Sequence, residues 1–325
     1  MSVLIFVENQ DGKLKKSARE AASYGAKLAG KLGTDAVAVA LGKVDHSELA
    51  TLGQQGVSKV LHEENAKLDH FDSRAYTKAV AAAADKAGAT VLVLSSTFNG
   101  KALAPRLSVR LKAGVVTNVT EMANTEGTFT VKKGVFSGKG VANFTFATDK
   151  KIITVNANSF PIAKGEGTAT VEDFSAGLSD SDFGVKVTHV EKAGEGIPLP
   201  EAELVVSAGR GLKGPENWGM IEEMANILHA ATACSRAVSD VDWRPHHEHV
   251  GQNGLTISPN LYIAVAISGA IQHLAGVNQS KVIVVINKDP EAPFFKAADY
   301  GVVGDAFDVL PKLTEAVKKF RSTPH

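Results

Sequence analysis

A nearly uninterrupted apolar run at residues 261–267, LYIAVAI, constrains the fold of this chain more than any other feature. A strand without polar alternation is buried on both faces, as in a parallel sheet covered by helices on both sides. The run leads straight into Ser268 and Gly269, and a second apolar run follows at 282–286. We therefore predict a doubly wound α/β domain over residues 200–325. Its other expected elements are a strand at 203–207 and helices at 216–230, 269–276 and 306–320.

The first hundred residues alternate strand-like and helix-like segments, which indicates a parallel sheet with crossover helices. Gly33 is a stop signal for the first helix, and Ser73 is a candidate N-cap of the second. The expected strands lie at 3–7, 36–41, 57–61 and 91–95, and the expected helices at 14–32 and 73–87.

After residue 114 strand-like segments follow one another without a strong helix between them, so we expect antiparallel strands added to this N-terminal parallel-sheet α/β domain. Residues 163–183 are polar and read as irregular, and residues 185–190 read as one more strand. Two glycines and two prolines at 191–200 predict a boundary between domains 1–195 and 200–325. The strand-like segments are 115–122, 129–135, 141–146 and 152–155.

Composition excludes several classes of function. Lys plus Arg equals Asp plus Glu at 35 each, so no general field attracts nucleic acid or anionic lipid. One cysteine, Cys234, rules out an internal disulfide framework and a multi-cysteine metal site. No apolar stretch is long enough to predict a membrane span, and no leader pattern precedes residue 3. We expect a cytoplasmic protein, with a mature mitochondrial matrix form as the alternative.

Residues 209–214, GRGLKG, match a dinucleotide-binding fingerprint between a strand and a helix. Glycines there permit close approach of the backbone to a pyrophosphate. Pro215 removes one donor from the following helix, and no acidic residue ends an obvious second strand. A nicotinamide site and a plain tight turn are both open.

A second candidate site follows the apolar strand, where Ser268 and Gly269 precede a helix that carries His273. A hydroxyl and free backbone N–H groups at such a turn can bind a phosphate, although Ser268 could equally be a simple N-cap. Polar residues also occur at 250–254, an alternative Asn-Gly turn, at 286–290 and at 304–305. Ligands of doubly wound sheets lie outside the carboxyl ends of the strands, so these segments together predict a nucleotide cofactor.

Two other motifs have simpler explanations. Residues 243–249 hold three histidines in four positions, but a metal needs converging ligands, and the H-E-x-x-H spacing is absent. A solvated loop is favoured there. Residues 95–97 could contact phosphate, yet capping of a helix near Lys101 is the simpler interpretation.

The runs SGAIQHLAG and INKDPEAPFFKAADYGVVGD resemble the signature of the electron-transfer flavoprotein alpha subunit. VVSAGRGLKGPENW and ACSRAVSDVDW resemble preceding segments of the same family, and the strong similarity covers residues 203–320. The resemblance implies a flavodoxin-like FAD-binding domain at 200–325. It also implies an N-terminal domain that contacts a partner and holds no cofactor.

The family's function is implied in the same way. The chain would be an electron carrier without catalytic residues or a metal, and would form a heterodimer with a beta subunit. Acyl-CoA-type dehydrogenases of fatty acid beta-oxidation would donate electrons, and a quinone oxidoreductase of the respiratory chain would accept them. Two alternatives are a nicotinamide-dependent oxidoreductase using GRGLKG, and a chain that keeps the interaction surface but has lost its cofactor.

The resemblance also implies FAD contacts residue by residue. The flavin side would be bound by Arg210, Ser235, Arg236, Val250, Gly251, Gln252 and Asn253. The pyrophosphate and the flavin carbonyl edge would be bound by Ser268, Gly269, Ala270, Ile271, Gln272 and His273, and the adenosine half by Asn287, Asp305 and Ala306.

Arg236 and His273 suit a cofactor that becomes anionic on reduction, because a guanidinium cation and a polarising imidazole stabilise negative charge. Some positions depart from the family. Asn253 stands where Thr or Ser is usual, Leu255 where Lys is usual, and Ala266 and Ala208 where Gly is usual. We expect FAD binding to survive these changes, with altered redox tuning.

Overall fold

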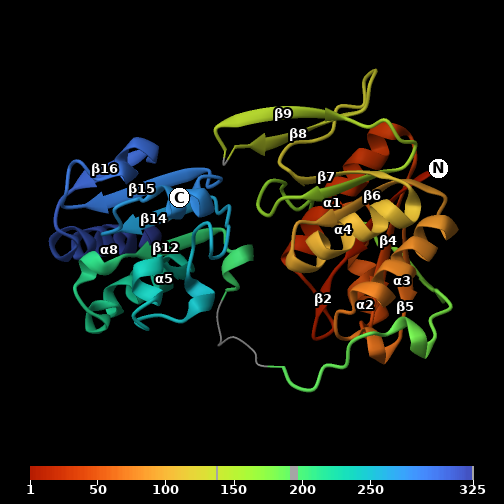
Figure 1. The fold of residues 1–325 in the computed structure, drawn as a ribbon, viewed down its shortest axis with the longest axis horizontal. Coiled ribbons are helices and arrows are strands. Elements are labelled where there is room, and N and C mark those ends of the chain that lie inside the picture. The colour runs from red at the N-terminus through yellow and green to blue at the C-terminus, as the bar shows by residue number, and fades with distance from the viewer. Residues whose placement is uncertain (137, 191–196, 324–325) are drawn as a thin grey trace. The chain divides into compact units, whose positions relative to one another are not determined.

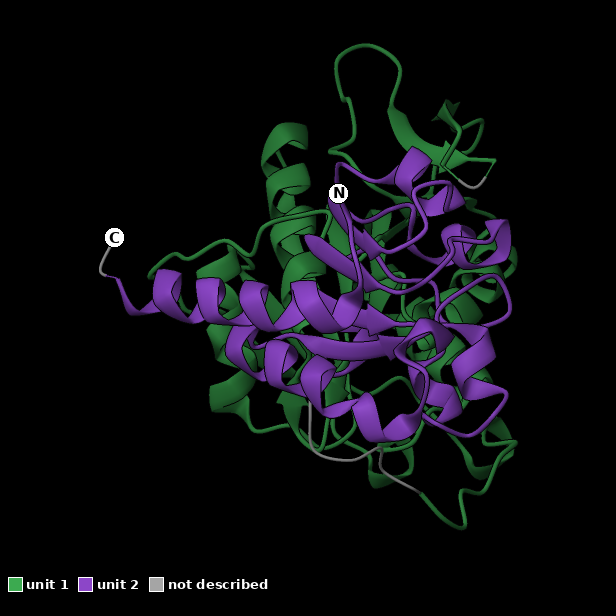
Figure 2. Cartoon of the chain, turned by 90° about the vertical axis from the view of Figure 1, so that its left-hand side faces the viewer, with its two compact units in different colours: residues 1–192 green, residues 193–325 purple. Residues whose placement is uncertain are grey.

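The computed structural model describes residues 1–136, 138–190 and 197–323. The chain forms two compact units, residues 1–192 and 193–325, each with its own sheet and helices (Figure 2). Most of the predicted boundary at 191–200 lies outside the described residues, so the division into domains 1–195 and 200–325 stays a prediction. No helix among the described residues is long and apolar enough to cross a membrane.

A nine-stranded sheet of order β11-β5-β4-β1-β6-β10-β7-β8-β9 forms the centre of the first unit (Figure 1). The parallel strands are β1 (Ser2–Val7), β4 (Asp35–Leu41), β5 (Lys59–Glu63), β6 (Ala89–Ser95), β7 (Gly114–Val119), β10 (Lys151–Val155) and β11 (Thr170–Asp173). The antiparallel strands are β8 (Thr130–Val135) and β9 (Gly140–Thr145), and a separate short hairpin comprises β2 (Asn9–Gln10) and β3 (Lys13–Leu14).

Both faces of this sheet are buried, and alternate residues of each strand pack into opposite cores. In β1, Val3 and Ile5 pack on the α1 side, whereas Leu4 and Phe6 pack with α3 and α4. Apolar side chains at successive positions therefore fill two separate cores, as the absence of polar alternation predicts. The helices are α1 (Lys16–Leu32), α2 (His46–Ala50), α3 (Ser73–Lys86) and α4 (Phe98–Leu111).

Helix ends in the first unit confirm two local predictions and correct one. Gly33 ends α1 in the left-handed conformation, with φ 62°. Thr97 caps α4 by accepting a hydrogen bond from the Gly100 N–H at 3.0 Å. The N-cap of α3, however, is Asp72, whose carboxylate accepts from the Arg74 N–H at 2.8 Å. Ser73 is the first residue of the helix, because the carboxylate one position earlier satisfies the free N–H groups.

The region after residue 114 differs from its prediction. β8 and β9 pair antiparallel as expected, but β10 lies between β6 and β7 and pairs parallel with both. Ile152 and Ile153 are fully buried on opposite faces, as a central strand requires. β11 forms in a segment expected to be irregular, and residues 185–190 form no strand. β11 is held by pairing with β5 rather than by its own apolar content.

The second unit has a five-stranded parallel sheet of order β13-β12-β14-β15-β16. In chain order this is 2-1-3-4-5, the flavodoxin-like arrangement, so the predicted doubly wound fold is confirmed. The predicted strands appear as β12 (Leu204–Ala208), β14 (Leu261–Val265) and β15 (Val282–Asn287), and two strands that were not predicted are β13 (Ala231–Cys234) and β16 (Tyr300–Val303).

Helices cover both faces of this second sheet. α5 (Gly219–Leu228) and α8 (Ala306–Ser322) pack together over one face, whose core includes Ile263 and Val265. α7 (Ile271–Val277) and Phe294 lie over the other face, against Tyr262 and Ala264. A short helix, α6 (Arg236–Ser239), follows β13. Successive side chains of β14 therefore point in turn into two cores, and both faces of the strand are buried.

Candidate cofactor site

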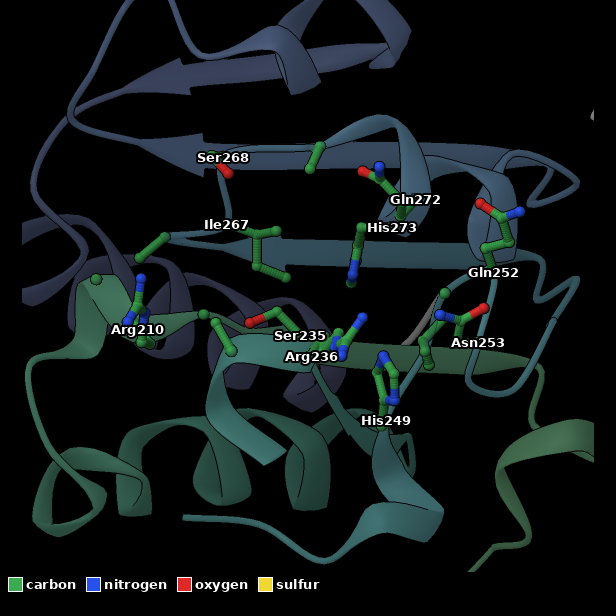
Figure 3. Close-up of a pocket in the computed structure, with 17 residues that line it drawn as sticks. Arg210, Ser235, Arg236, His249, Gln252, Asn253, Ile267, Ser268, Gln272 and His273 are labelled. Atoms are coloured by element: carbon green, nitrogen blue, oxygen red, sulfur yellow. The ribbon is translucent and has the colours of Figure 1, made fainter. Parts of the chain in front are cut away.

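A cavity of about 460 Å³ lies at the carboxyl ends of β12, β13 and β14 (Figure 3). In the 2-1-3-4-5 order, the chain leaves β12 toward one side and β14 toward the other, and the crevice between such strands is where ligands bind. Ligand pockets commonly measure ~300–1,000 Å³. The residues that line it are Gly209, Arg210, Gly211, Ser235, Arg236, Ala237, His249, Val250, Gly251, Gln252, Asn253, Ala266, Ile267, Ser268, Ala270, Gln272 and His273.

The floor of the cavity depends on a glycine after β12. A Cβ atom at Gly209 would stand 2.4 Å from the Ala266 carbonyl oxygen, a backbone atom that cannot move aside. The Gly209 N–H donates to the Val265 carbonyl at 3.0 Å, so the two loops approach as closely as two strands. Ala266 itself has φ 52°, the left-handed region that favours glycine. The methyl group predicted to crowd this turn therefore costs backbone strain as well.

One wall is the loop between β13 and β14, which backbone hydrogen bonds hold in place. The Val250 N–H donates to the Cys234 carbonyl at 3.1 Å, and the Gln252 N–H donates to the Gln272 carbonyl at 2.7 Å. Val250 is buried, whereas the side chains of Gln252 and Asn253 are exposed at the cavity (Figure 3). The loop and α7 are thus fixed to each other.

The histidine-rich segment before this loop is solvated at His246 and His247, which are exposed as predicted, but side-chain contacts also anchor it. Arg244 donates to both carboxylate oxygens of Glu248, at 2.8 and 2.6 Å, and lies over the Trp218 ring. His246 Nδ1 is 2.7 Å from the Ser239 hydroxyl. Among the described residues these histidines form no group that could hold a metal. His249 instead lines the cavity, and burial lowers its pKa.

His273 is the most informative side chain of the site. It is 7% exposed, and its Nε2 lies 2.8 Å from the Tyr262 hydroxyl. Its Nδ1 is buried and has no hydrogen-bond partner of good geometry. Desolvation lowers the pKa of His273 to about 4, with His249 adding to the effect and the Val250 backbone opposing it. The imidazole is therefore neutral at pH 7, with one ring nitrogen left for a ligand.

Two arginines supply positive charge around this neutral ring. Arg236 begins α6 and is exposed, with its Nε 3.2 Å from Asp240 Oδ2. Arg210 follows Gly209 and begins a short 3-10 turn, Arg210–Leu212. In Figure 3 these side chains and His273 face the cavity from different elements. Guanidinium groups that cannot deprotonate favour an anionic ligand.

The structure brings most of the predicted site residues together. Those that line the cavity are Arg210, Ser235, Arg236, Val250, Gly251, Gln252, Asn253, Ser268, Ala270, Gln272 and His273. Gly269 and Ile271 lie next to them in sequence but do not line it. Gly209 and Gly211 belong to the predicted turn at 209–214, and Ala266 was noted as a departure from the family. Ala237, His249 and Ile267 also line the cavity and were not predicted.

The three residues predicted to bind adenosine lie outside the cavity and already have structural roles. Asn287 donates to the Ile267 carbonyl at 2.9 Å and accepts from the Asp289 N–H at 3.0 Å. Asp305 caps α8 by accepting from the Phe307 N–H at 3.0 Å, and Ala306 is buried in the core. Their adenosine-binding role stays a prediction.

Two details of the turns bear on the alternatives. α7 begins at Ile271 with Ala270 as its N-cap, so Ser268 is not the helix cap. The Ser268 carbonyl accepts from the Phe294 N–H at 3.1 Å, and the residue itself is exposed. The glycine-rich turn at 209–214 contains one short 3-10 turn, a second follows at Pro215–Asn217, and α5 begins only at Gly219. A dinucleotide fingerprint leads directly into a helix, which weighs against the nicotinamide interpretation.

Comparison with known proteins identifies the same family in both units of the chain. A model of the "Electron transfer flavoprotein domain" matches residues 3–179, and one of the "Electron transfer flavoprotein FAD-binding domain" matches residues 198–278. The chain is 34% identical to the electron transfer flavoprotein subunit alpha of Bacillus subtilis, over 98% of this chain and 97% of the relative. It is 37% identical to the protein of that name from Paracoccus denitrificans, over 97% and 99%. It is also 34% identical to Protein FixB of Clostridium saccharobutylicum, over 98% and 97%.

Proposed function

This chain belongs to the electron transfer flavoprotein alpha-subunit family, with FAD as its cofactor, and from that premise we propose that it carries electrons as one half of a heterodimer with a beta subunit. The relatives' names describe an alpha subunit, which implies a second chain. We propose that the FAD lies in the cavity of residues 193–325. The observation that supports this most directly is the buried, unpartnered Nδ1 of His273.

The residues present fit a flavin. A ring system with carbonyl and N–H groups at its edge offers either partner that a neutral imidazole nitrogen needs. Small or apolar residues such as Gly209, Ala237 and Ile267 are part of the cavity lining, and such residues suit a flat aromatic face. Exposed amides of Gln252 and Asn253 offer both donors and acceptors at the rim.

Bound FAD supplies the redox chemistry, and the protein supplies binding, orientation and electrostatics. Arg236 contributes a fixed positive charge on one side of the cavity. His273 contributes a neutral imidazole, and the direction of its dipole depends on whether the Tyr262 hydroxyl donates to it or accepts from it. The Tyr262 hydroxyl can donate to Nε2, which leaves the proton on Nδ1, or accept from it, which leaves a lone pair there. Burial raises the pKa of Tyr262, so its proton stays on the phenol in both arrangements.

We propose acyl-CoA-type dehydrogenases as donors and a quinone oxidoreductase as acceptor. What supports them is the resemblance of the motifs between residues 203 and 320. The absence of group chemistry is part of the same proposal, because an electron carrier needs no general acid or base.

Co-expression with the beta subunit tests the function. We expect a yellow heterodimer whose flavin absorbance changes in one-electron steps during stepwise reduction, without nicotinamide turnover. Arg236→Gln should lower the flavin midpoint potentials by tens of millivolts, because a cation beside an anionic reduced cofactor is lost. Arg321→Gln, at the far end of α8, is the matched control. A colourless heterodimer, or equal potentials in both variants, would contradict the proposal.

A further inference from the structure

The first unit contains a cluster of possible metal ligands that the electron-carrier function does not use. His46 is the first residue of α2, His62 lies in β5, and Asp173 ends β11. One ligand atom from each lies within 4.8 Å of the other two. His62 and Asp173 are direct partners in the parallel pairing of β5 with β11, and α2 packs against β11. Three separate elements therefore bring these side chains to one point.

The protonation of His62 follows from its hydrogen bond. The ring is buried, at 1% exposure, and its Nε2 is 2.8 Å from the Gly42 carbonyl oxygen. A carbonyl oxygen can only accept, so Nε2 carries the proton and Nδ1 presents a lone pair. That Nδ1 is buried and has no hydrogen-bond partner. Histidines that bind metals commonly donate their other ring N–H to a backbone carbonyl in this way.

The other two groups have the spacing of ligands of one ion. His46 Nε2 lies 3.3 Å from Asp173 Oδ1. Two ligand atoms placed ~2.0 Å from a tetrahedral zinc ion stand roughly 3.3 Å apart. The side chains of His46 and Asp173 are 51% and 83% exposed, so both are free to adjust toward the fixed nitrogen of His62.

We propose that His46, His62 and Asp173 bind a zinc ion, with a fourth position open to water. Two imidazoles and a carboxylate suit zinc, whereas magnesium and calcium prefer sites built from oxygen ligands alone. The bound ion would tie α2 to β11, the edge strand of the nine-stranded sheet. Zinc would then stabilise the first unit by an amount that grows with the logarithm of the free Zn²⁺ concentration above its Kd, because it binds the folded arrangement.

Metal titration of the flavin-loaded heterodimer tests the site. After treatment with a chelator, Zn²⁺ is titrated against a chromophoric competitor, and Co²⁺ is used to record ligand-field bands. We expect one more zinc bound by the unmodified protein than by His46→Gln or Asp173→Asn, or an affinity at least tenfold weaker in each variant. The thermal midpoint should rise with Zn²⁺ in the unmodified protein and rise less, or not at all, at the same Zn²⁺ concentration in both variants.

The exposed ligands are used because replacement of buried His62 could impair folding by itself. His189→Gln is the matched control, since His189 is an exposed histidine of the same unit, and it should bind zinc like the unmodified protein. His247→Gln tests the histidine-rich segment. Equal zinc binding by unmodified protein, His46→Gln and Asp173→Asn would overturn the proposal, as would loss of binding in His247→Gln alone.

Discussion

Each unit has a largely parallel sheet covered by helices on both faces, but the polar groups at the ends of the strands differ in their surroundings. In the first unit these groups satisfy one another. Glu8, after β1, accepts from the Asn99 side chain at 2.9 Å, and the Ser95 hydroxyl donates to the Ser17 carbonyl at 2.8 Å. In the second unit, glycines follow β12 and the polar side chains face a cavity. The architecture alone therefore does not make a site; the residues that follow each strand decide it.

A closer comparison concerns one buried histidine in each unit. His62 and His273 both have Nε2 in a hydrogen bond and Nδ1 without a partner. The partner of His62 is a carbonyl, which makes Nε2 the donor and places the lone pair of the neutral ring on Nδ1. The partner of His273 is a hydroxyl, which allows either tautomer. The first arrangement suits a metal, and the second suits a cofactor whose charge changes.

The largest expected effects come from adding one methyl group to each unit. A Cβ at Gly209 would be 2.4 Å from the Ala266 carbonyl oxygen, and one at Gly100 would be 1.9 Å from the Ser95 carbonyl oxygen. Each alanine variant should lose about 3 kcal/mol in free energy of unfolding, the upper end for overpacking. Only Gly209→Ala should also release FAD, as judged by absorbance after gel filtration. Gly219→Ala, with open space around its Cβ, is the control.

The stability of the second unit should depend on pH, because His273 is buried there in its neutral form. Its pKa is about 4 in the folded chain against an ordinary 6.5. The unfolded chain takes up the proton first, so the free energy of unfolding falls as the pH drops from about 6.5 to about 4, and the contribution is flat below that range. The loss should reach roughly 3 kcal/mol. Urea unfolding at several pH values, compared with His273→Gln, measures it; parallel curves would contradict this assignment.

Tyr262→Phe removes the hydroxyl that distinguishes the two histidines. His273 would then be buried with both ring nitrogens unpartnered, at a cost of ~1–3 kcal/mol in free energy of unfolding. The flavin potential should shift as well, because the hydroxyl no longer selects the tautomer. Tyr300→Phe, at an exposed position of the same unit, is the control. Unchanged stability and potential would mean that the Tyr262 hydroxyl has no influence on the site.

Asn253→Thr restores the residue type expected from the resemblance. We expect FAD to stay bound and both midpoint potentials to move by ~20–60 mV, which is about 0.5–1.4 kcal/mol per electron. A redox titration monitored by flavin absorbance measures the change. If both potentials stay where they are, Asn253 does not tune the cofactor.

Ala266→Gly should have the smallest effect. Relief of the left-handed strain at φ 52° gains ~1–2 kcal/mol, and the added freedom of the unfolded chain offsets ~0.4–1 kcal/mol of it. A small net rise in the urea midpoint is expected. A fall would show that the methyl group packs usefully against Gly211.

The sequence predicted the fold best where burial leaves a pattern. The apolar runs at 261–267 and 282–286 became β14 and β15, and residues 3–7 became β1. β16 was missed because its residues are exposed and carry no burial signal, and β13 because its sequence, ATAC, consists of small residues. The place of β10 between β6 and β7 depends on long-range pairing, which local sequence does not encode.

The site was predictable to the extent that its residues occur in loops after strands. The sequence places His249 in a solvated loop, because residues 243–249 lack the H-E-x-x-H spacing of a metal site. In the structure, Arg244 and Glu248 form an ion pair within this segment, and of its three histidines only His249 lines the cavity. The loops of the site are brought together by contacts such as the hydrogen bond from the Gln252 N–H to the Gln272 carbonyl, which joins residues twenty positions apart.

The buried position of Cys234 makes its labelling rate a natural probe of local opening in the second unit. The thiol is fully buried, and burial raises its pKa to about 12, so the reactive thiolate is scarce in the closed protein. Its carbonyl holds the Val250 N–H of the cavity wall. The thiol itself lies in the core that α5 covers, with Trp218 and Met224, so an alkylating reagent can reach the sulfur only while that core is open, and the rate of labelling reports how often it opens. A second cysteine engineered on the surface could take up a dye selectively, with the native thiol left in place.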